Sequence, residues 1–228
     1  MDYKVRHVVF DFNGTLFHDT SLHTEAWVKT SAKYSKTPFT AEIVEAKLMG
    51  LTNHDIVAVL LQKAPSKNEV DTIGQEKEEY YRSLVSSVEG GPHLVSSAEA
   101  VFMFLQQHGI SYTIATSSEI NNLKFFTGIF QLEQWFDLKK IVYDNGCYPG
   151  KPAPDIYLKA MEVLGARPDD TLVFEDAVSG LKAARDAGIE RRVVINNIDI
   201  NHHLPEGLAW KKITSFEEVL YEPEKFFH

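Results

Sequence analysis

Five short apolar runs are spaced along the chain, and each has about the length of a β-strand. They occupy residues 5–10, 111–118, 139–146, 169–176 and 191–196. The runs are apolar enough to be buried on both faces, which is typical of parallel strands. Two helical patterns, at residues 154–166 and 176–189, lie between the later runs and stop at Gly165 and Gly188. This alternation predicts an α/β fold with a doubly wound, Rossmann-like parallel sheet.

Residues 18–87 follow a different pattern that contains no convincing strand. Helical periodicity recurs there at residues 23–34, 40–50, 52–64 and 69–88. Thr52 precedes one of these apolar-periodic runs and is a suitable helix start. We therefore expect an all-helical cap domain over residues 18–87, inserted into a core domain formed by residues 1–17 and 88–228.

Polar side chains follow the predicted strands of the core. They are Asp11 and Asn13 after the first run, Thr116, Ser117 and Ser118 at the end of the second, Lys151 in a later loop, and Glu175 and Asp176 at the end of the fourth. Because the carboxyl ends of parallel strands meet at one edge of a sheet, these groups should lie together. Carboxylates, a hydroxyl and an ammonium suit phosphoryl transfer with Mg²⁺. Ser117 or Ser118 also fits the N-cap of a following helix.

Four ordered segments resemble the motifs of the haloacid dehalogenase superfamily. These are DFNGTL, IATSS, GKPAPD and FEDAVSGLKAARDAG, and together they cover the whole core domain. The helical insertion resembles the cap of the β-phosphoglucomutase-like branch. The resemblance implies that Asp11 is a nucleophile that forms an aspartyl-phosphate. It also implies that Asp11, the Asn13 backbone carbonyl and Asp176 hold Mg²⁺, with Glu175 nearby.

The same resemblance implies which residues contact a substrate. The expected contacts are Thr116, Ser117 and Lys151 in the core and His23, Asn53 and Lys77 in the cap. For Lys77, in the charged stretch QEKEEYY, a solvated surface charge is the favoured interpretation. Asn53 stands where mutases of the branch carry a phosphate-binding arginine. An amide cannot form the charged bidentate clamp of Arg, so the sequence argues against a mutase acting on bisphosphorylated sugars.

Asn13 departs from the family pattern, because phosphatases and mutases of the family carry a general acid–base aspartate at this position. Losing such a group typically slows a reaction by about 10²–10⁴-fold. Three alternatives remain open. The leaving group could be good enough to need no acid, as in an acyl or aryl phosphate. Another residue could substitute, the candidates being His18, His23 and Glu175. Deamidation of the Asn13-Gly14 pair could regenerate an aspartate.

The composition and net charge of the chain bear on which kinds of molecule it binds. The chain has 228 residues, a net charge of −9 and a pI near 5.5, so we expect neither nucleic acid nor membrane partners. A single cysteine and the lack of an apolar leader favour a cytoplasmic location. We expect a monomer or a weak homodimer. The adjacent pair His202-His203 has no evident third ligand, and we do not interpret it as a metal site.

The leading hypothesis is a Mg²⁺-dependent phosphatase that hydrolyses a phosphoric monoester or acyl phosphate of a small metabolite. One alternative is a catalytically impaired protein that binds a phosphorylated metabolite and acts as a regulator. The other is a phosphoglucomutase-like enzyme.

Overall fold

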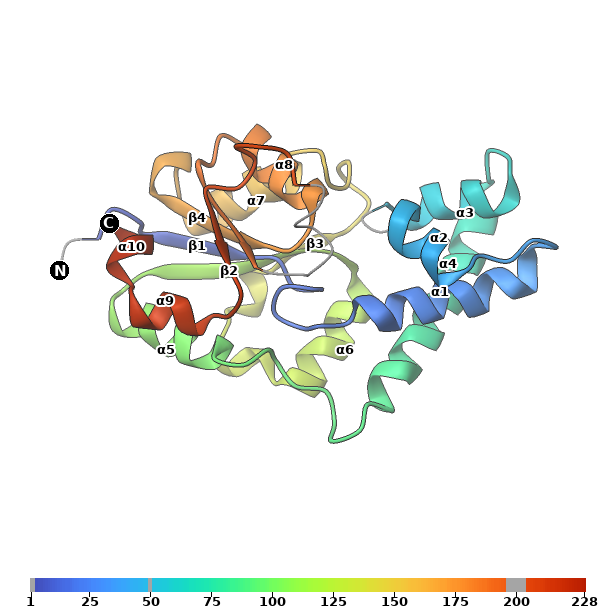
Figure 1. Ribbon diagram of the computed structural model, residues 1–228, viewed down its shortest axis with the longest axis horizontal. Coiled ribbons are helices and arrows are strands. Elements are labelled where there is room, and N and C mark those ends of the chain that lie inside the picture. Colours follow the sequence, from blue (N-terminus) through green and yellow to red (C-terminus); the bar gives the residue numbers. More distant parts are fainter. Residues whose placement is uncertain (1–2, 49–50, 196–203) are drawn as a thin grey trace. The chain divides into compact units, whose positions relative to one another are not determined.

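The computed structural model describes residues 3–48, 51–195 and 204–228, and the chain divides into two compact units. Met1–His18 and His93–His228 form one, which we call the sheet unit; Asp19–Pro92 forms the other, the helical unit (Figure 1). The divisions fall after His18 and after Pro92, whereas the sequence suggested boundaries after residues 17 and 87.

The sheet unit is built on a six-stranded sheet in which every neighbouring pair of strands is parallel. The strands are β1 (His7–Phe10), β2 (Ser111–Glu119), β3 (Val142–Asp144), β4 (Thr171–Glu175), β5 (Arg191–Ile195) and β6 (Lys211–Ile213), in the spatial order β3-β2-β1-β4-β5-β6. The predicted α/β class is therefore confirmed, and β6 extends the sheet beyond the five predicted runs.

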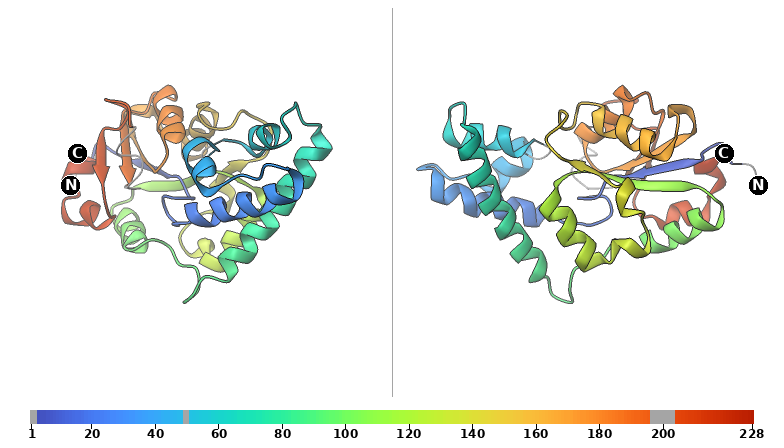
Figure 2. Two further views of the ribbon diagram at one scale, coloured as in Figure 1. Left: turned by 45° about the vertical axis from the view of Figure 1, so that its right-hand side comes forward. Right: turned by 180° about the vertical axis from the view of Figure 1, so that it is seen from behind.

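Helices cover both faces of this sheet (Figures 1 and 2). They are α5 (Ala98–Gln107), α6 (Ile120–Phe130), α7 (Asp155–Leu164), α8 (Val178–Asp186), α9 (Glu217–Tyr221) and α10 (Glu224–Phe227). Short 3₁₀ segments cover Leu132–Gln134, Leu138–Lys140 and Pro168–Asp170. Helices α7 and α8 lie on one face, and α5, α6 and α9 lie on the other. Helix α7 ends at Gly165, whose φ of +66° is the left-handed conformation that glycine adopts readily.

Strand β1 lies in the middle of the sheet, and its last three residues are apolar and buried. Val8, Val9 and Phe10 have no solvent-exposed surface. The ring of Phe10 stacks on Phe174 of the neighbouring strand β4, with centroids 5.2 Å apart. On the opposite face, Val9 belongs to the apolar cluster that α7 and α8 cover. This packing holds the carboxyl end of β1 firmly beside β4.

The helical unit consists of α1 (Thr20–Tyr34), α2 (Ala41–Ile43), a π-helical segment (Val44–Leu48), α3 (Asn53–Leu61) and α4 (Lys67–Ser86). No strand occurs among its described residues, as the sequence predicted. Thr52 caps α3 by accepting a hydrogen bond from the Asp55 amide at 3.2 Å. Trp27 and its apolar neighbours form a separate core for this unit. Within the described residues of both units, no helix combines the length and the apolarity that crossing a bilayer requires.

Candidate active site

The carboxyl ends of β1 and β4 meet where the winding of the sheet changes direction. From β1 the chain moves outward through β2 and β3, then returns to β4 and moves outward through β5 and β6. Asp11 follows β1, and its amide donates to the Phe174 carbonyl at 3.0 Å. Glu175 ends β4 and Asp176 comes next. Ligands of doubly wound sheets bind at such switch points, so these carboxylates occupy the expected place for chemistry.

Lys151 connects the two strands through its ammonium group. Its Nζ lies 2.6 Å from Asp11 Oδ1, 2.6 Å from Glu175 Oε1 and 3.4 Å from the Ala115 carbonyl oxygen. Burial alone would lower the pKa of Lys151, but the charges of Asp11 and Glu175 outweigh it and raise that pKa. The pKa of Asp11 is raised to about 7, because burial and the nearby Glu175 charge together outweigh the opposing effect of the Lys151 ammonium. The lysine is therefore a fixed cation beside the proposed nucleophile.

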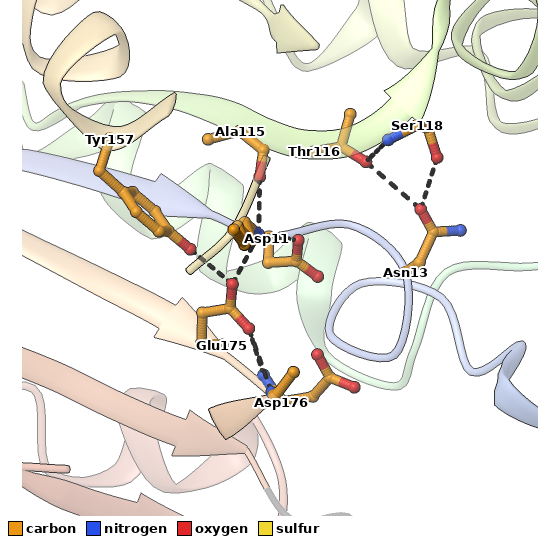
Figure 3. Close-up of polar contacts among 10 residues, drawn as sticks. Asp11, Asn13, Ala115, Thr116, Ser118, Tyr157, Glu175 and Asp176 are labelled. Carbon is orange, nitrogen blue, oxygen red and sulfur yellow. Dashed lines mark hydrogen bonds and ion pairs between the residues drawn. The ribbon is translucent and has the colours of Figure 1, made fainter. Parts of the chain in front are cut away.

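Glu175 is completely buried, and both of its carboxylate oxygens accept hydrogen bonds (Figure 3). Oε1 accepts from Lys151 Nζ and from the Tyr157 hydroxyl, both at 2.6 Å. Oε2 accepts from the backbone amides of Asp176 at 3.0 Å and Ala177 at 3.1 Å. A Cβ atom at Gly180 would lie 1.7 Å from Oε1, so glycine is required for this carboxylate to sit where it does. These contacts make Glu175 the residue that positions Lys151.

The same edge of the sheet offers a set of oxygen ligands for a cation. Ligand atoms of Asp11, Glu175 and Asp176 all lie within 4.8 Å of one another. Gly14 lets Asp176 approach the loop after β1, because a Cβ atom there would lie 1.9 Å from Asp176 Oδ2. An all-oxygen set of carboxylates matches the ligand preference of Mg²⁺. Because Glu175 already accepts four hydrogen bonds, Asp11 and Asp176 are the better ligands of the three.

Asn13 is held against the end of β2 by two hydroxyl groups (Figure 3). Its side-chain oxygen Oδ1 accepts from Ser118 Oγ at 2.7 Å and from Thr116 Oγ1 at 3.3 Å. Thr116 Oγ1 also accepts the Ser118 backbone N–H at 3.1 Å. These contacts place the Asn13 side chain beside both hydroxyl groups.

The neighbourhood of Asn13 differs from the sequence expectations at the start of the next helix. Ser118 contacts Asn13 and the Ser117 side chain is exposed, so the expected substrate contact of Ser117 stays a prediction. The expectation that Ser117 or Ser118 caps the next helix is wrong. Glu119 is the N-cap of α6, accepting from the amides of Asn121 at 2.8 Å and Asn122 at 3.1 Å. Strand β2 thus extends past both serines, and this leaves Ser118 directed at Asn13.

The loop also bears on deamidation of the Asn13-Gly14 pair. Deamidation requires the Gly14 amide nitrogen to lose its proton and attack the Asn13 side chain. The Gly14 N–H donates to the Phe17 carbonyl at 2.7 Å, and the Asn13 side chain is anchored by hydroxyls. Both contacts oppose the reaction, and the structure therefore favours a retained asparagine.

The three substrate contacts expected in the cap lie in one polar cluster of the helical unit. Lys77 Nζ lies 2.7 Å from His23 Nδ1 and 2.9 Å from Glu78 Oε1. Asn53 Nδ2 donates to the same Glu78 oxygen at 3.1 Å. The expectation that Lys77 is a solvated surface charge is wrong, because this residue is only 2% exposed.

His23 is engaged on both ring nitrogens, and this limits its use as a replacement acid or base. The Lys77 ammonium has only hydrogen-bond donors, so Nδ1 must accept, and the ring proton lies on Nε2. Nε2 is 3.3 Å from Asp19 Oδ2, which also accepts from the Tyr81 hydroxyl. The His23 ring stacks on Tyr81 with centroids 3.9 Å apart. These contacts fix His23 in one tautomer, and the partners that make them belong to the helical unit.

The sequence also singled out His18 and the pair His202-His203. His18 is exposed at the end of the sheet unit's first segment. The pair His202-His203 lies outside the described residues.

Comparison with known proteins agrees with this geometry. A family model described as haloacid dehalogenase-like hydrolase matches residues 5–188. A phosphorylated carbohydrates phosphatase of Thermotoga maritima is 28% identical over 188 residues, covering 81% of this chain and 82% of the relative. A Drosophila melanogaster protein named "Probable pseudouridine-5'-phosphatase" is 32% identical over 197 residues, covering 82% of this chain and 80% of that relative. The crystal structure of a HAD hydrolase, family IA, variant 3, from Entamoeba histolytica matches with a TM-score of 0.85 and 36% sequence identity. The match covers 94% of this chain and 95% of that chain.

Proposed function

Since the chain belongs to the haloacid dehalogenase-like hydrolases, we propose that it is a Mg²⁺-dependent phosphatase of small phosphorylated metabolites that works through an aspartyl-phosphate on Asp11. One observation carries the proposal. Lys151 bridges Asp11 and Glu175 at 2.6 Å from each, beside Asp176 at the switch point of the sheet. This arrangement joins a nucleophile, a fixed cation and a pair of cation ligands.

Each residue has a defined part in the proposed reaction. A carboxylate oxygen of Asp11 attacks phosphorus in line with the bond to the leaving group. Lys151 and the Thr116 hydroxyl stabilise the negative charge on the phosphoryl oxygens. Asp11, the Asn13 carbonyl and Asp176 would hold Mg²⁺, which supplies further charge neutralisation when bound.

The helical unit is the proposed source of substrate selectivity. His23, Asn53 and Lys77 belong to one polar cluster there, so a substrate group that contacted one of them would perturb the others. Hydroxylated or anionic metabolites fit a cluster of this chemistry. The printed names of two relatives, a phosphatase of phosphorylated carbohydrates and one of pseudouridine 5′-phosphate, support the same substrate class.

The test is a phosphate-release assay on a panel of sugar phosphates, nucleotide monophosphates, p-nitrophenyl phosphate and acetyl phosphate, with Mg²⁺ and with EDTA. We expect turnover only with Mg²⁺ and none in the Asp11→Asn variant. Asp71→Asn, a matched change at an exposed aspartate, should keep full activity. Activity of the Asp11→Asn variant equal to that of the parent would refute the proposed nucleophile.

Asn13 supports a second candidate, a regulator that binds a phosphorylated metabolite without turning it over. The amide leaves binding groups in place while removing the usual proton-transfer group. Thermal stabilisation by phosphate and Mg²⁺, combined with no product from any ester or acyl phosphate, would favour the regulator over the enzyme.

A further inference from the structure

The two halves of an aspartyl-phosphate reaction have different proton requirements. In the first half, Asp11 bonds to phosphorus and the bond from phosphorus to the leaving oxygen breaks. An alkoxide leaving group needs a proton at that moment, whereas the carboxylate released from an acyl phosphate needs none. In the second half, water attacks phosphorus, the bond to Asp11 breaks, and a proton must leave the water.

Position 13 is an amide, which cannot move a proton in either half, and the structure places its side-chain oxygen against two hydroxyl groups. Ser118 and Thr116 both direct hydroxyl protons at the Asn13 side-chain oxygen, at 2.7 and 3.3 Å. An amide oxygen held in this way can orient a neighbouring group, but it neither gives up nor takes a proton at ordinary pH.

The described side chains that contact Asp11 do not take over the proton transfer that Asn13 cannot perform. Among the described residues, the side chain that bonds to the Asp11 carboxylate is Lys151, and that lysine also pairs with Glu175. Each Glu175 oxygen already accepts two hydrogen bonds, and the Tyr157 hydroxyl directs its proton at one of them. Among the described residues at this edge of the sheet, Glu175 therefore has no oxygen left to act as a base, and Asp176 is a proposed Mg²⁺ ligand.

We propose that the chain takes its phosphoryl group from acyl phosphates in preference to alkyl phosphate esters, and that it retains this group on Asp11 as a long-lived phosphoenzyme. The inference rests on the proposed function and names its substrate class. Phosphoryl transfer from the acyl phosphate releases a carboxylate directly. Hydrolysis of the aspartyl-phosphate is then the slow step, because none of the described side chains that contact Asp11 is a base able to accept the proton from water.

The experiment uses the full chain with Mg²⁺ and compares acetyl phosphate with glycerol 3-phosphate. Rapid acid quench and intact-mass measurement quantify the phosphoenzyme, and phosphate release gives the rate of turnover. With acetyl phosphate we expect nearly stoichiometric phosphoenzyme, a burst of acetate and slow release of phosphate. Peptide mapping should place the phosphoryl group on Asp11, and Asp11→Asn should abolish the adduct.

Asn13→Asp is the decisive variant. It restores a carboxylate that can accept the same hydroxyl protons, so the fold should tolerate it. We expect phosphoenzyme decay to accelerate by about 10²-fold or more, with turnover of glycerol 3-phosphate rising by a similar factor. Asn68→Asp, at an exposed asparagine of α4, is the matched control and should change neither rate.

Three results would overturn the inference in distinguishable ways. Equal turnover of both substrates without an adduct leaves the proposed phosphatase standing but removes the phosphoenzyme. A His18→Gln variant with a longer-lived adduct would identify His18 as the missing base. Neither turnover nor adduct with either substrate would refute the inference and the proposed function together.

Discussion

Replacing Glu175 by glutamine tests whether this residue organises the site by accepting hydrogen bonds from four donors. The two side chains have nearly the same shape, so the change alters hydrogen bonding and charge without leaving a cavity. A glutamine presents one oxygen and one NH₂ group. If the NH₂ group replaces Oε1, it faces the donors of Lys151 and Tyr157. If it replaces Oε2, it faces the amides of Asp176 and Ala177.

In either orientation two buried donors lose their acceptor. An unsatisfied buried donor costs about 1–3 kcal/mol, so the free energy of unfolding should fall by roughly 2–6 kcal/mol. For a chain of this size, a loss of this magnitude lowers the melting temperature by roughly 5–20 °C. The Lys151 ammonium keeps its contact with Asp11, so the protein should fold at low temperature.

Differential scanning calorimetry measures the effect, with Glu133→Gln as a control at an exposed glutamate. Phosphate binding, followed by isothermal titration at a temperature where the variant is folded, reports on the position of Lys151. A melting temperature within a degree or two of the parent would refute the account of Glu175 as the organising acceptor.

Three further changes test other parts of the structure. Gly14→Ala should abolish Mg²⁺ binding in a titration calorimeter, because the new Cβ atom would lie 1.9 Å from Asp176 Oδ2. Ser66→Ala should lower the free energy of unfolding measured in urea by about 1 kcal/mol, because it removes the capping box at the start of α4. Lys77→Met should destabilise the helical unit by about 3–5 kcal/mol in thermal unfolding, because it removes the buried ammonium group that Glu78 contacts at 2.9 Å.

Matched variants separate these effects from general strain. Gly90→Ala changes a glycine with a similar φ of +80° but no atoms within 4 Å of the added Cβ, so it should leave Mg²⁺ binding intact. Lys36→Met removes an exposed lysine and should leave thermal unfolding unchanged. Full Mg²⁺ affinity in Gly14→Ala, or parental stability in Ser66→Ala or Lys77→Met, would contradict the corresponding contact.

The position of the candidate site was predictable because β-strand patterning and sheet topology act together. Apolar runs located the strands, and the polar residue after each run marked the edge where Asp11, Lys151 and Asp176 meet. The role of Glu175 was harder to foresee. Its partners Lys151 and Tyr157 come from the loop before α7 and from α7 itself, and only the folded sheet brings their donors to its oxygens.

The spacing of residues along α4 indicates that Lys77 is buried, but the neighbouring charged residues in QEKEEYY favoured an exposed position. Ile73, Lys77, Tyr81 and Val85 recur every four residues along α4, so they share one face of the helix. Apolar and aromatic residues on that face indicate that Lys77 points inward with them. Ser118 carried no comparable signal, because its contact with Asn13 depends on β2 continuing past the point where a helix start was expected.

The central place of β1 has a consequence for biosynthesis. This strand leaves the ribosome before the other five strands, and its two partners, β2 and β4, are made much later. Val8, Val9 and Phe10 therefore have no strand partner until β2 has been made. A nascent chain that ends before β4 would carry Asp11 without Glu175, and the carboxylate cluster would be complete only when β4 and Asp176 are added.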